Sequence, residues 1–238
     1  MKRFWDLRKI SVIIALLFAA GTAIIVSGSA RKAVPAAART EDKRTLVIDA
    51  GHGGMDGGAV SGGGLKESEV NLAIAQRLFD LCRAFGLDCA MTRFSEALDY
   101  PPEAKSVREK KQWDLRRRAG QANDTPFAVL LSIHQNRYPD ARPSGTQVFY
   151  APTEGSERFA ALTHDNLISC LCPENRRVCA PASGSIYLMK NVDCPAILVE
   201  CGFLSNPEEA GKLADPAYQT GIAAVLCASY IQYLAPVS

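Results

Sequence analysis

The apolar positions after residue 44 fall into short continuous runs that alternate with longer stretches at helical spacing. The short runs are rich in Val, Ile and Leu and are bounded by turn residues, a pattern typical of strands buried on both faces of a sheet. The three strongest are residues 45–49, 128–134 and 195–200, and weaker strand candidates are residues 87–92, 146–151 and 186–190.

The longer stretches predict helices. Residues 67–85 carry apolar side chains at helical spacing, and Gly86 ends that pattern. Further helices are expected at residues 113–123, 156–169, 207–213 and 217–234. Strands that alternate with helices predict a single α/β domain, with a largely parallel mixed sheet of about six strands and helices on both faces.

Composition and charge agree with an ordinary globular domain. The chain has 238 residues, of which 47% are hydrophobic and 22% charged, which excludes a disordered, collagenous or polytopic membrane protein. The net charge of +2 is unevenly spread, because residues 1–32 carry six Lys and Arg and one Asp. The remaining 21 basic and 24 acidic side chains make the domain mildly acidic, so we expect no nucleic-acid partner.

The N-terminus has the features of a targeting segment. Four basic residues within positions 2–9 precede residues 10–26, which contain no charged residue, and small residues follow at 27–30. We therefore expect a signal peptide or membrane anchor over residues 1–30, a linker over 31–43 and the catalytic domain over 44–236. The chain is expected to be exported, either secreted or membrane-anchored. A buried core helix is the alternative for the apolar run, and the flanking charges fit it badly.

Eight cysteines lie in the domain, and export would permit disulfides. None of them has the C-x-x-C spacing of a structural zinc site. One or two disulfides are expected, and Cys172–Cys179 is the easiest to form because both residues flank a polar loop. Several other cysteines lie in apolar stretches, where a buried free thiol is the commoner role.

Residues able to bind metal or move a proton lie at or just after the ends of the three strongest strands: His52, His134 and Glu200. Because the carboxyl ends of parallel strands meet at one edge of a sheet, the catalytic site is expected at that edge. Glu67, at the start of the helix after the glycine-rich loop, can reach the same edge. Two His and one Glu, with a fourth position left to water, form a common ligand set of catalytic zinc.

Each of these residues also has a simpler interpretation. His52 could be a turn residue in a glycine-rich loop, and His134 a hydrogen-bonded side chain at a strand end. Glu67 could merely complement the helix dipole, and Glu69 is a rival for its position. Glu200 is hardest to explain otherwise, since a buried carboxylate without a partner costs several kcal/mol. The remaining histidine, His164, lies in a polar helical stretch and is expected at the surface.

The other common catalytic motifs are missing from the sequence. The glycine-rich loop lacks the G-x-G-x-x-G and G-K-[ST] patterns of nucleotide sites. Neither a G-x-S-x-G elbow nor an H-E-x-x-H helix is present, so serine-hydrolase and zincin mechanisms lack their signatures.

Six segments occur in the order found in zinc-dependent N-acetylmuramoyl-L-alanine amidases of the type 3 class, and together they resemble that family over about residues 44–234: VIDAGHGGMDGGA, LKESEVNLAIAQRL, RRRAGQAN, LLSIHQN, SGTQVFY and AILVECGFLSN. The resemblance implies that His52, Glu67 and His134 hold one Zn²⁺ and that Glu200 is the catalytic glutamate. It also implies cleavage of the bond between the muramic acid lactyl group and L-alanine of peptidoglycan. Within the family the chain looks most like amidases that act on the spore cortex during germination.

The spore-cortex resemblance implies a location in the cell envelope or in the space between the spore membranes. The reaction would precede formation of muramic-δ-lactam by a muramic acid deacetylase, and an activating protein is a possible partner.

Asn136 and Arg118 are candidates for holding substrate or for orienting a ligand, and a helix-surface salt bridge is the alternative for Arg118. Residues 94–113 and the loop from Cys170 to Cys179 match nothing assignable and are candidates for substrate or partner specificity.

Two other functions stay open from the sequence. Another zinc peptidase acting between amino acids could use the same four residues. A wall-binding module without activity would be expected to have lost some of them, whereas all four are present.

Overall fold

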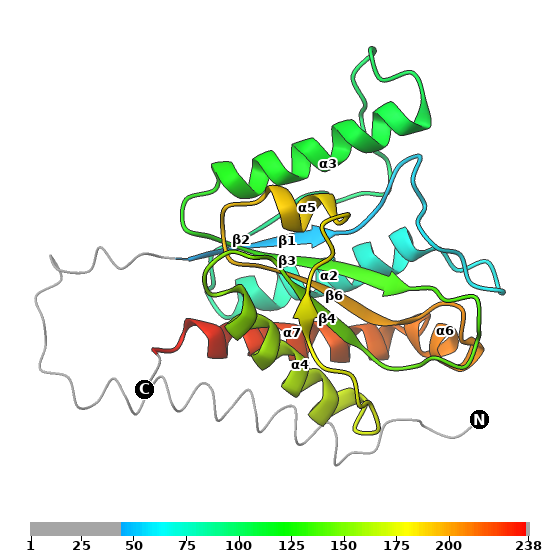
Figure 1. Cartoon of the computed structure of the whole chain (residues 1–238), viewed down its shortest axis with the longest axis vertical. Helices are drawn as coiled ribbons and strands as arrows, with labels where there is room; N and C mark the ends of the chain where they lie inside the picture. The colour runs from blue at the N-terminus through cyan, green and yellow to red at the C-terminus, as the bar shows by residue number, and fades with distance from the viewer. Residues whose placement is uncertain (1–43, 237–238) are drawn as a thin grey trace, which may run out of the picture.

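The computed structural model describes residues 44–236, which form one six-stranded sheet covered by helices (Figure 1). The strand order is β2-β1-β3-β6-β4-β5. All neighbouring strands are parallel except β4 and β6, which are antiparallel. The strands are β1 (Thr45–Ala50), β2 (Cys89–Met91), β3 (Ala128–Asn136), β4 (Gln147–Tyr150), β5 (Ala180–Pro181) and β6 (Ala196–Phe203). The predicted α/β class with a mixed, largely parallel sheet is confirmed.

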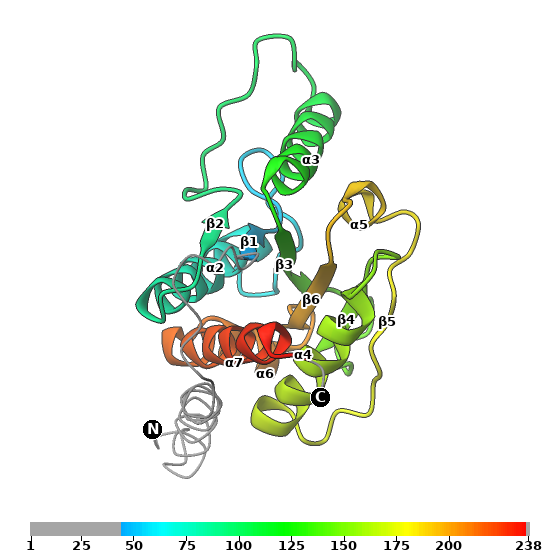
Figure 2. The same cartoon turned by 90° about the vertical axis from the view of Figure 1, so that its left-hand side faces the viewer.

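Helices cover both faces of the sheet, as predicted. Helices α2, α4 and α7 pack on one face, and α3 and α5 lie over the other (Figures 1 and 2). The short helix α6 follows the end of β6. The bounds are α2 (Glu67–Ala84), α3 (Val107–Asp124), α4 (Ser156–Leu171), α5 (Tyr187–Asn191), α6 (Pro207–Leu213) and α7 (Pro216–Leu234).

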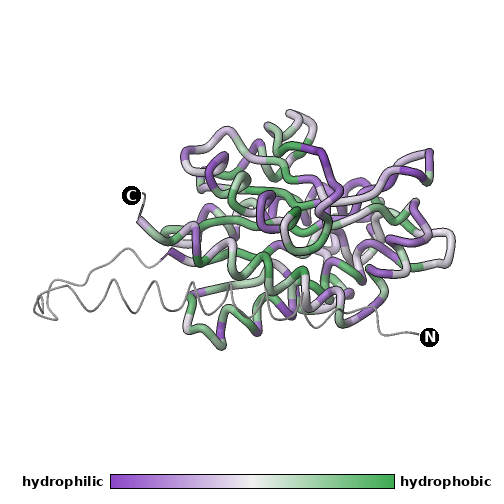
Figure 3. Tube along the Cα trace, turned by 90° about the horizontal axis from the view of Figure 1, so that it is seen from below, coloured by the Kyte–Doolittle hydropathy of each residue, from purple (hydrophilic) through white to green (hydrophobic). Residues whose placement is uncertain are grey.

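The main core lies between the sheet and the α2, α4 and α7 layer. Successive side chains of a strand point to opposite faces, so Leu46 and Ile48 of β1 pack in this layer while Val47 packs under α3 and α5. Hydrophobic positions run through the middle of the fold, and hydrophilic ones gather toward its outer loops (Figure 3). The burial of the strands on both faces explains their continuous apolar runs.

Strand register brings the predicted catalytic residues to one edge. In the β3–β6 pair His134 is the direct partner of Glu200, and in the β1–β3 pair Ala50 is the partner of Ile133. His52 therefore lies just beyond the end of β1, level with His134 near the end of β3. The carboxyl ends of β1, β3 and β6 meet as expected.

Two elements differ from the expectation. Residues 186–190 were predicted as a strand, but the structure has helix α5 there, and the edge strand β5 lies earlier, at Ala180–Pro181. A short apolar run does not distinguish the two states by periodicity. Helix α3 also begins before the predicted residue 113, because a capping box formed by Ser106 and Glu109 starts it at Val107.

Two expectations about single residues are wrong. His164 is buried rather than at the surface, and its Nε2 lies 2.7 Å from the carbonyl oxygen of Arg177. The Cys172–Cys179 disulfide is not formed, and all eight cysteines are free. The Cys172 thiol instead contacts the Leu167 carbonyl and the Thr146 hydroxyl, which keeps it against the end of α4.

The expected targeting segment and linker, residues 1–43, lie outside the described residues. Within residues 44–236, no helix has the length and apolar character needed to cross a membrane.

Candidate active site

The structure brings His52, Glu67 and His134 together at the carboxyl edge of the sheet. The Oε1 atom of Glu67 lies 3.2 Å from His52 Nε2 and 2.9 Å from His134 Nδ1. One ligand atom from each residue lies within 4.8 Å of the others, and the two imidazole rings meet edge to face at 4.9 Å. The three side chains thus offer two imidazole nitrogens and one carboxylate oxygen to a common point.

The structure also distinguishes Glu67 from Glu69 as the candidate ligand. Glu67 is 4% exposed and is the first residue of α2, so its carboxylate reaches back over the sheet edge. Its Oε2 accepts a hydrogen bond from the Ala59 amide at 2.8 Å, and its Oε1 accepts one from the Gln135 amide at 3.1 Å. Glu69, by contrast, is half-exposed and pairs with Lys66.

The charges at this point suit a divalent cation. Burial alone would raise the pKa of Glu67, but the hydrogen bonds and charges of His134 and His52 outweigh it and hold that pKa well below its usual range. The Glu67 carboxylate is therefore ionised at neutral pH. An ionised carboxylate flanked by two imidazoles in a half-buried position is a donor set that fits zinc.

A second carboxylate orients His52. Asp56 Oδ2 lies 3.1 Å from His52 Nδ1, on the side of the ring away from Glu67, and the Lys111 ammonium lies 2.8 Å from the same Asp56 oxygen. Burial lowers the pKa of His52, but Asp56 and Glu67 together raise it to about 9. A carboxylate that accepts the Nδ1 proton leaves Nε2 facing the proposed metal, the usual arrangement for a histidine ligand.

Two buried arginines hold the backbone that carries His52. Arg118 of α3 donates to the carbonyl oxygens of Ala50, at 2.6 Å, and of His52. Arg93, after β2, donates to the carbonyl oxygens of Ala50 and Gly51 at 2.9 and 3.2 Å. Because His52 has φ +62°, a left-handed conformation that is unfavourable for a non-glycine residue, these bonds fix a strained backbone.

The position of Arg118 decides between the two interpretations of its role. It is 2% exposed and pairs with Asp49 and Asp114, so the helix-surface salt bridge is wrong. Its Nε and both terminal nitrogens donate to protein acceptors, namely the carboxylates of Asp114 and Asp49 and the carbonyl oxygens of Ala50 and His52, which fits a role in orienting the His52 loop. Asn136 lies at the end of β3, beyond a register shift, and its main-chain oxygen accepts a bond from the Leu204 amide.

Close packing explains two of the loop glycines. A Cβ atom at Gly51 would lie 2.3 Å from Nε2 of His134. At Gly58, where φ is +68°, a Cβ atom would lie 2.6 Å from Oε2 of Glu67. The glycine-rich loop therefore wraps directly against two of the candidate ligands, which a larger residue would displace.

Glu200 lies on β6 beside His134, and its Oε2 atom is buried without a hydrogen-bond partner among residues 44–236. Burial raises the pKa of Glu200 to about 7. A carboxyl group with this pKa can accept and return a proton near neutral pH. The unpartnered oxygen makes Glu200 the member of the site that is free to act on a ligand.

Three of the four candidate residues line a pocket of about 300 Å³ between α3 and α5. His52, His134 and Glu200 line it, together with residues of α3 that include Lys111, Asp114 and Leu115, and with residues 185–188 on the side of α5. The carboxylates of Asp49 and Asp56 line it as well. Sequence reasoning missed Asp56, Lys111, Arg93 and Tyr187. Asp56 follows His52 in the same loop, which was the available signal, whereas the other three come from distant elements and have no local signal.

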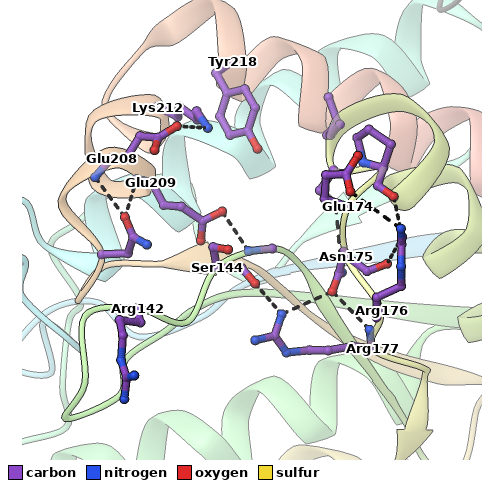
Figure 4. A pocket seen from close by; sticks show the side chains of 15 residues that line it. Arg142, Ser144, Glu174, Asn175, Arg176, Arg177, Glu208, Glu209, Lys212 and Tyr218 are labelled. Atoms are coloured by element: carbon purple, nitrogen blue, oxygen red, sulfur yellow. Dashed lines mark hydrogen bonds and ion pairs between the residues drawn. The ribbon is translucent and has the colours of Figure 1, made fainter.

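A second pocket, of about 790 Å³, lies between α6, the end of α4 and Tyr218 of α7 (Figure 4). Several of its charged side chains have partners within the protein: Lys212 pairs with Glu208 at 2.7 Å, and Glu209 accepts a bond from the Gly145 amide at 2.8 Å. The four candidate catalytic residues do not line it. Of the four candidate residues, His52, His134 and Glu200 instead line the smaller pocket.

The segment 94–113, which the sequence left unassigned, contacts the His52 loop through Tyr100. The Tyr100 hydroxyl accepts a hydrogen bond from the Met55 amide at 3.0 Å and lies 3.5 Å from the Gly53 carbonyl oxygen. The Tyr100 ring packs edge to face on Trp113 of α3. The loop is thus held from this segment as well as from α3.

Comparison with known proteins identifies the family of this chain. A germination-specific N-acetylmuramoyl-L-alanine amidase of Bacillus subtilis is 38% identical over 191 residues, which cover 80% of this chain and 79% of that protein. The CwlD amidase of Clostridioides difficile, solved in complex with the GerS lipoprotein, is similar with a TM-score of 0.76 and 32% identity, covering 80% of this chain and 98% of that one. The catalytic domain of CwlV from Bacillus (Paenibacillus) polymyxa has a TM-score of 0.67 and 26% identity, with 80% and 98% covered. The family model described as N-acetylmuramoyl-L-alanine amidase matches residues 46–231, and the chain therefore belongs to that family of enzymes.

Proposed function

We propose that this amidase is zinc-dependent and hydrolyses the amide bond between the lactyl group of N-acetylmuramic acid and L-alanine of the stem peptide. The observation that carries the proposal is the convergence of His52, Glu67 and His134 beside the unpartnered carboxylate of Glu200. Family membership favours this reaction over cleavage between amino acids by another zinc peptidase, and over a wall-binding module without activity.

His52, Glu67 and His134 would hold the zinc. When bound there, zinc supplies a Lewis acid that polarises a carbonyl group and lowers the pKa of water toward neutrality. Asp56 keeps the His52 ring in the orientation that presents Nε2, and the Arg93 and Arg118 contacts keep the loop in place. These contacts would hold the ligands in position around the zinc.

Glu200 is the group that moves the proton. Its carboxylate takes a proton from the attacking water and returns it to the departing alanine nitrogen. Both transfers need a pKa near the working pH, and burial raises the pKa of Glu200 to about 7. The pocket between α3 and α5 admits the peptide to this carboxylate.

We further propose that the substrate is spore-cortex peptidoglycan, with the reaction preceding the formation of muramic-δ-lactam by a muramic acid deacetylase. The similarity to a germination-specific amidase supports this role. A relative that is solved in complex with a lipoprotein supports an activating protein partner for this chain. Residues 1–30 would act as signal peptide or anchor and 31–43 as linker, so that the domain at 44–236 works outside the cytoplasm.

The products of digestion test the reaction. Zinc-loaded enzyme incubated with purified muropeptides is expected to release intact stem peptides with a free L-alanine amino group and to leave sugars with a free lactyl carboxyl group. Products cut within the peptide would instead support the peptidase alternative. Comparison of cortex and vegetative peptidoglycan as substrates tests the cortex role.

The Glu200→Gln variant tests the proton-transfer role. It preserves shape and removes the proton acceptor, so the rate is expected to fall by roughly 10²–10⁴-fold, the usual contribution of general acid–base catalysis. Zinc stoichiometry, measured by atomic emission, should stay at that of the wild type. Full activity with retained zinc would contradict the assignment.

A further inference from the structure

Asn71 lies one helical turn after Glu67, on the same face of α2. Its side chain is 0% exposed and does not line the catalytic pocket. A buried amide in this position cannot meet a substrate in that pocket. Any effect of Asn71 on the site is therefore exerted through the residues that it contacts.

The side-chain amide of Asn71 bonds to all three segments that carry the candidate ligands. Its Nδ2 donates to the carbonyl oxygen of Gly51 at 3.1 Å and to Oε1 of Glu67 at 3.5 Å. Its Oδ1 accepts a hydrogen bond from Nε2 of Gln135 at 3.1 Å. Gly51 immediately precedes one candidate histidine ligand, and Gln135 immediately follows the other. The Gly51 oxygen also accepts a bond from Arg93, at 3.2 Å.

The groups around Asn71 permit one orientation of its amide. The Gly51 carbonyl oxygen and the ionised Glu67 carboxylate only accept hydrogen bonds, so the NH₂ group of Asn71 must face them. Its oxygen then faces Gln135 and requires a donor there. Aspartate in this place would set a second carboxylate against Glu67, and leucine would supply neither donor nor acceptor. The site thus needs the asparagine amide in this orientation.

The contacts of Gln135 point to a role beyond stability. Its side chain is 3% exposed, and its Oε1 has no hydrogen-bond partner within residues 44–236. A buried amide oxygen without a partner is destabilising, and an apolar side chain of the same shape would avoid that loss. The side-chain NH₂ group donates to Asn71, and the main-chain amide donates to Glu67 at 3.1 Å. Both of these bonds act on the pair formed by Asn71 and Glu67.

We propose that Asn71 is a positioning residue that fixes the His52 loop, Glu67 and the end of β3 relative to one another, and that Gln135 acts through it by orienting its amide. This inference rests on the proposed function, because it concerns how the chain holds the zinc ligands. Without the Asn71 amide, Glu67 keeps the bonds from the main-chain amides of Ala59 and Gln135. The carboxylate and the loop before His52, however, lose their common donor.

Zinc affinity of the full chain, measured by competition with a chelator, tests the inference without turnover. The variants are Asn71→Ala, Gln135→Ala and the double variant, with folding checked by circular dichroism. The control is Gln219→Ala. Gln219 of α7 is also a buried helical amide, 7% exposed, and it donates to the Leu213 carbonyl oxygen at 2.8 Å, away from the candidate ligands.

Asn71→Ala is expected to weaken zinc binding about 10–100-fold, the usual effect of removing a group that orients a metal ligand. Gln135→Ala should weaken it less, about three- to tenfold, because Asn71 keeps its own donor contacts. The double variant should bind zinc within about twofold of Asn71→Ala, since the effects of residues that act in series do not add. Gln219→Ala should lose stability and keep the wild-type zinc affinity.

Cobalt in place of zinc gives a second readout, which a loss of stability alone would not change. The visible absorption of bound Co²⁺ reports the arrangement of its ligands. At saturating cobalt the spectrum of Asn71→Ala should therefore differ from that of the wild type. The spectrum of Gln219→Ala should match the wild type.

The inference is overturned if Asn71→Ala keeps both the zinc affinity and the cobalt spectrum of the wild type, or if Gln219→Ala weakens zinc binding equally. If Asn71→Ala does not fold, Gln135→Ala decides, and an unchanged zinc affinity there would overturn it. Effects that add fully in the double variant would contradict the action of Gln135 through Asn71. If zinc binding responds as expected but the zinc-loaded wild type releases no peptide from muropeptides, the inference holds and the proposed reaction is wrong.

Discussion

The guanidinium of Arg118 and the carboxylate of Asp49 form a buried ion pair, with 2.9 Å between Nη1 and Oδ1. Asp49 also accepts hydrogen bonds from the hydroxyls of Ser132 and Thr92, at 2.6 and 2.7 Å. The same guanidinium holds the carbonyl oxygens of Ala50 and His52. The pair thus links the folding of α3 onto the sheet to the position of a candidate metal ligand.

Removal of the guanidinium should therefore affect both stability and metal binding. Arg118→Gln leaves the Asp49 charge buried without its partner, which is expected to lower the unfolding free energy by about 3–5 kcal/mol. Zinc affinity of the metal-free protein should fall by roughly 10–100-fold, as for other groups that orient a ligand.

The neighbouring arginine provides the control for this experiment. Arg117 pairs with Asp114 and donates to the Thr92 carbonyl oxygen, but it does not touch the His52 loop. Arg117→Gln should lower the unfolding free energy by at most about 1 kcal/mol, because the Arg117–Asp114 pair is partly exposed. It should leave zinc affinity unchanged. Equal effects of the two variants in denaturant and zinc titrations would argue against the link.

Stability should depend on the ionisation of Asp49 at low pH. Burial alone would raise the pKa of Asp49, but Arg118, together with the Ser132 hydroxyl, outweighs it and lowers that pKa to about 2, from 3.8. A lowered pKa means that the folded state favours the ionised form, so this stabilisation is complete above pH 4 and is lost as the pH falls through 2. The loss amounts to about 2 kcal/mol.

The contribution of Asp49 can be separated from that of the other carboxylates with Asp49→Asn, which does not titrate. The difference in unfolding free energy between wild type and variant should shrink by about 2 kcal/mol between pH 6 and pH 2. Denaturant unfolding across this range measures it. A difference that stays constant with pH would show that Asp49 has an ordinary pKa.

The close approach at Gly51 predicts a steric effect on the metal site. Gly51→Ala places a methyl group where the His134 ring lies, so the ring must move and zinc binding should be lost. Gly62→Ala is the matched control, because a Cβ atom there meets nothing within 4 Å. Metal content after purification in excess zinc distinguishes them, and zinc bound normally by Gly51→Ala would count against His134 as a ligand.

The two glutamates of the first turn of α2 should differ in their effect on metal content. Glu67→Gln removes the carboxylate that lies between the two histidines and is expected to lose zinc, as is His134→Ala. Glu69→Gln alters a half-exposed residue that pairs with Lys66 and should keep full stoichiometry. Zinc retained by Glu67→Gln, or lost from Glu69→Gln, would reverse the choice between them.

Much of the fold follows from local patterns. The strands at the centre of the sheet carry continuous Val, Ile and Leu runs, which predicted them. Because His52, His134 and Glu200 lie at or just after strand ends in the sequence, their meeting at one edge of the sheet could also be predicted. The helix α5 was missed because its five residues are too few to show a period. The first half of α3 was missed because it is almost entirely polar and is started by the Ser106–Glu109 capping box rather than by apolar spacing.

The contacts that support the site could not be predicted from local sequence patterns. Arg118 lies within a run of three arginines, and nothing in that run marks the one that is buried. Its partner Asp49 is 69 residues away, so only the packing of α3 on the sheet distinguishes it. His164 was misjudged for the same reason, because its burial depends on a segment that follows α4.

The contact of Tyr100 with the backbone at Gly53 and Met55 has a consequence for engineering this enzyme. A chimera that takes residues 94–106 from a relative while keeping the native glycine-rich loop would lose the Tyr100 hydroxyl bond unless the donor supplies an equivalent hydroxyl at the same place. The two segments are therefore best exchanged together, as one module.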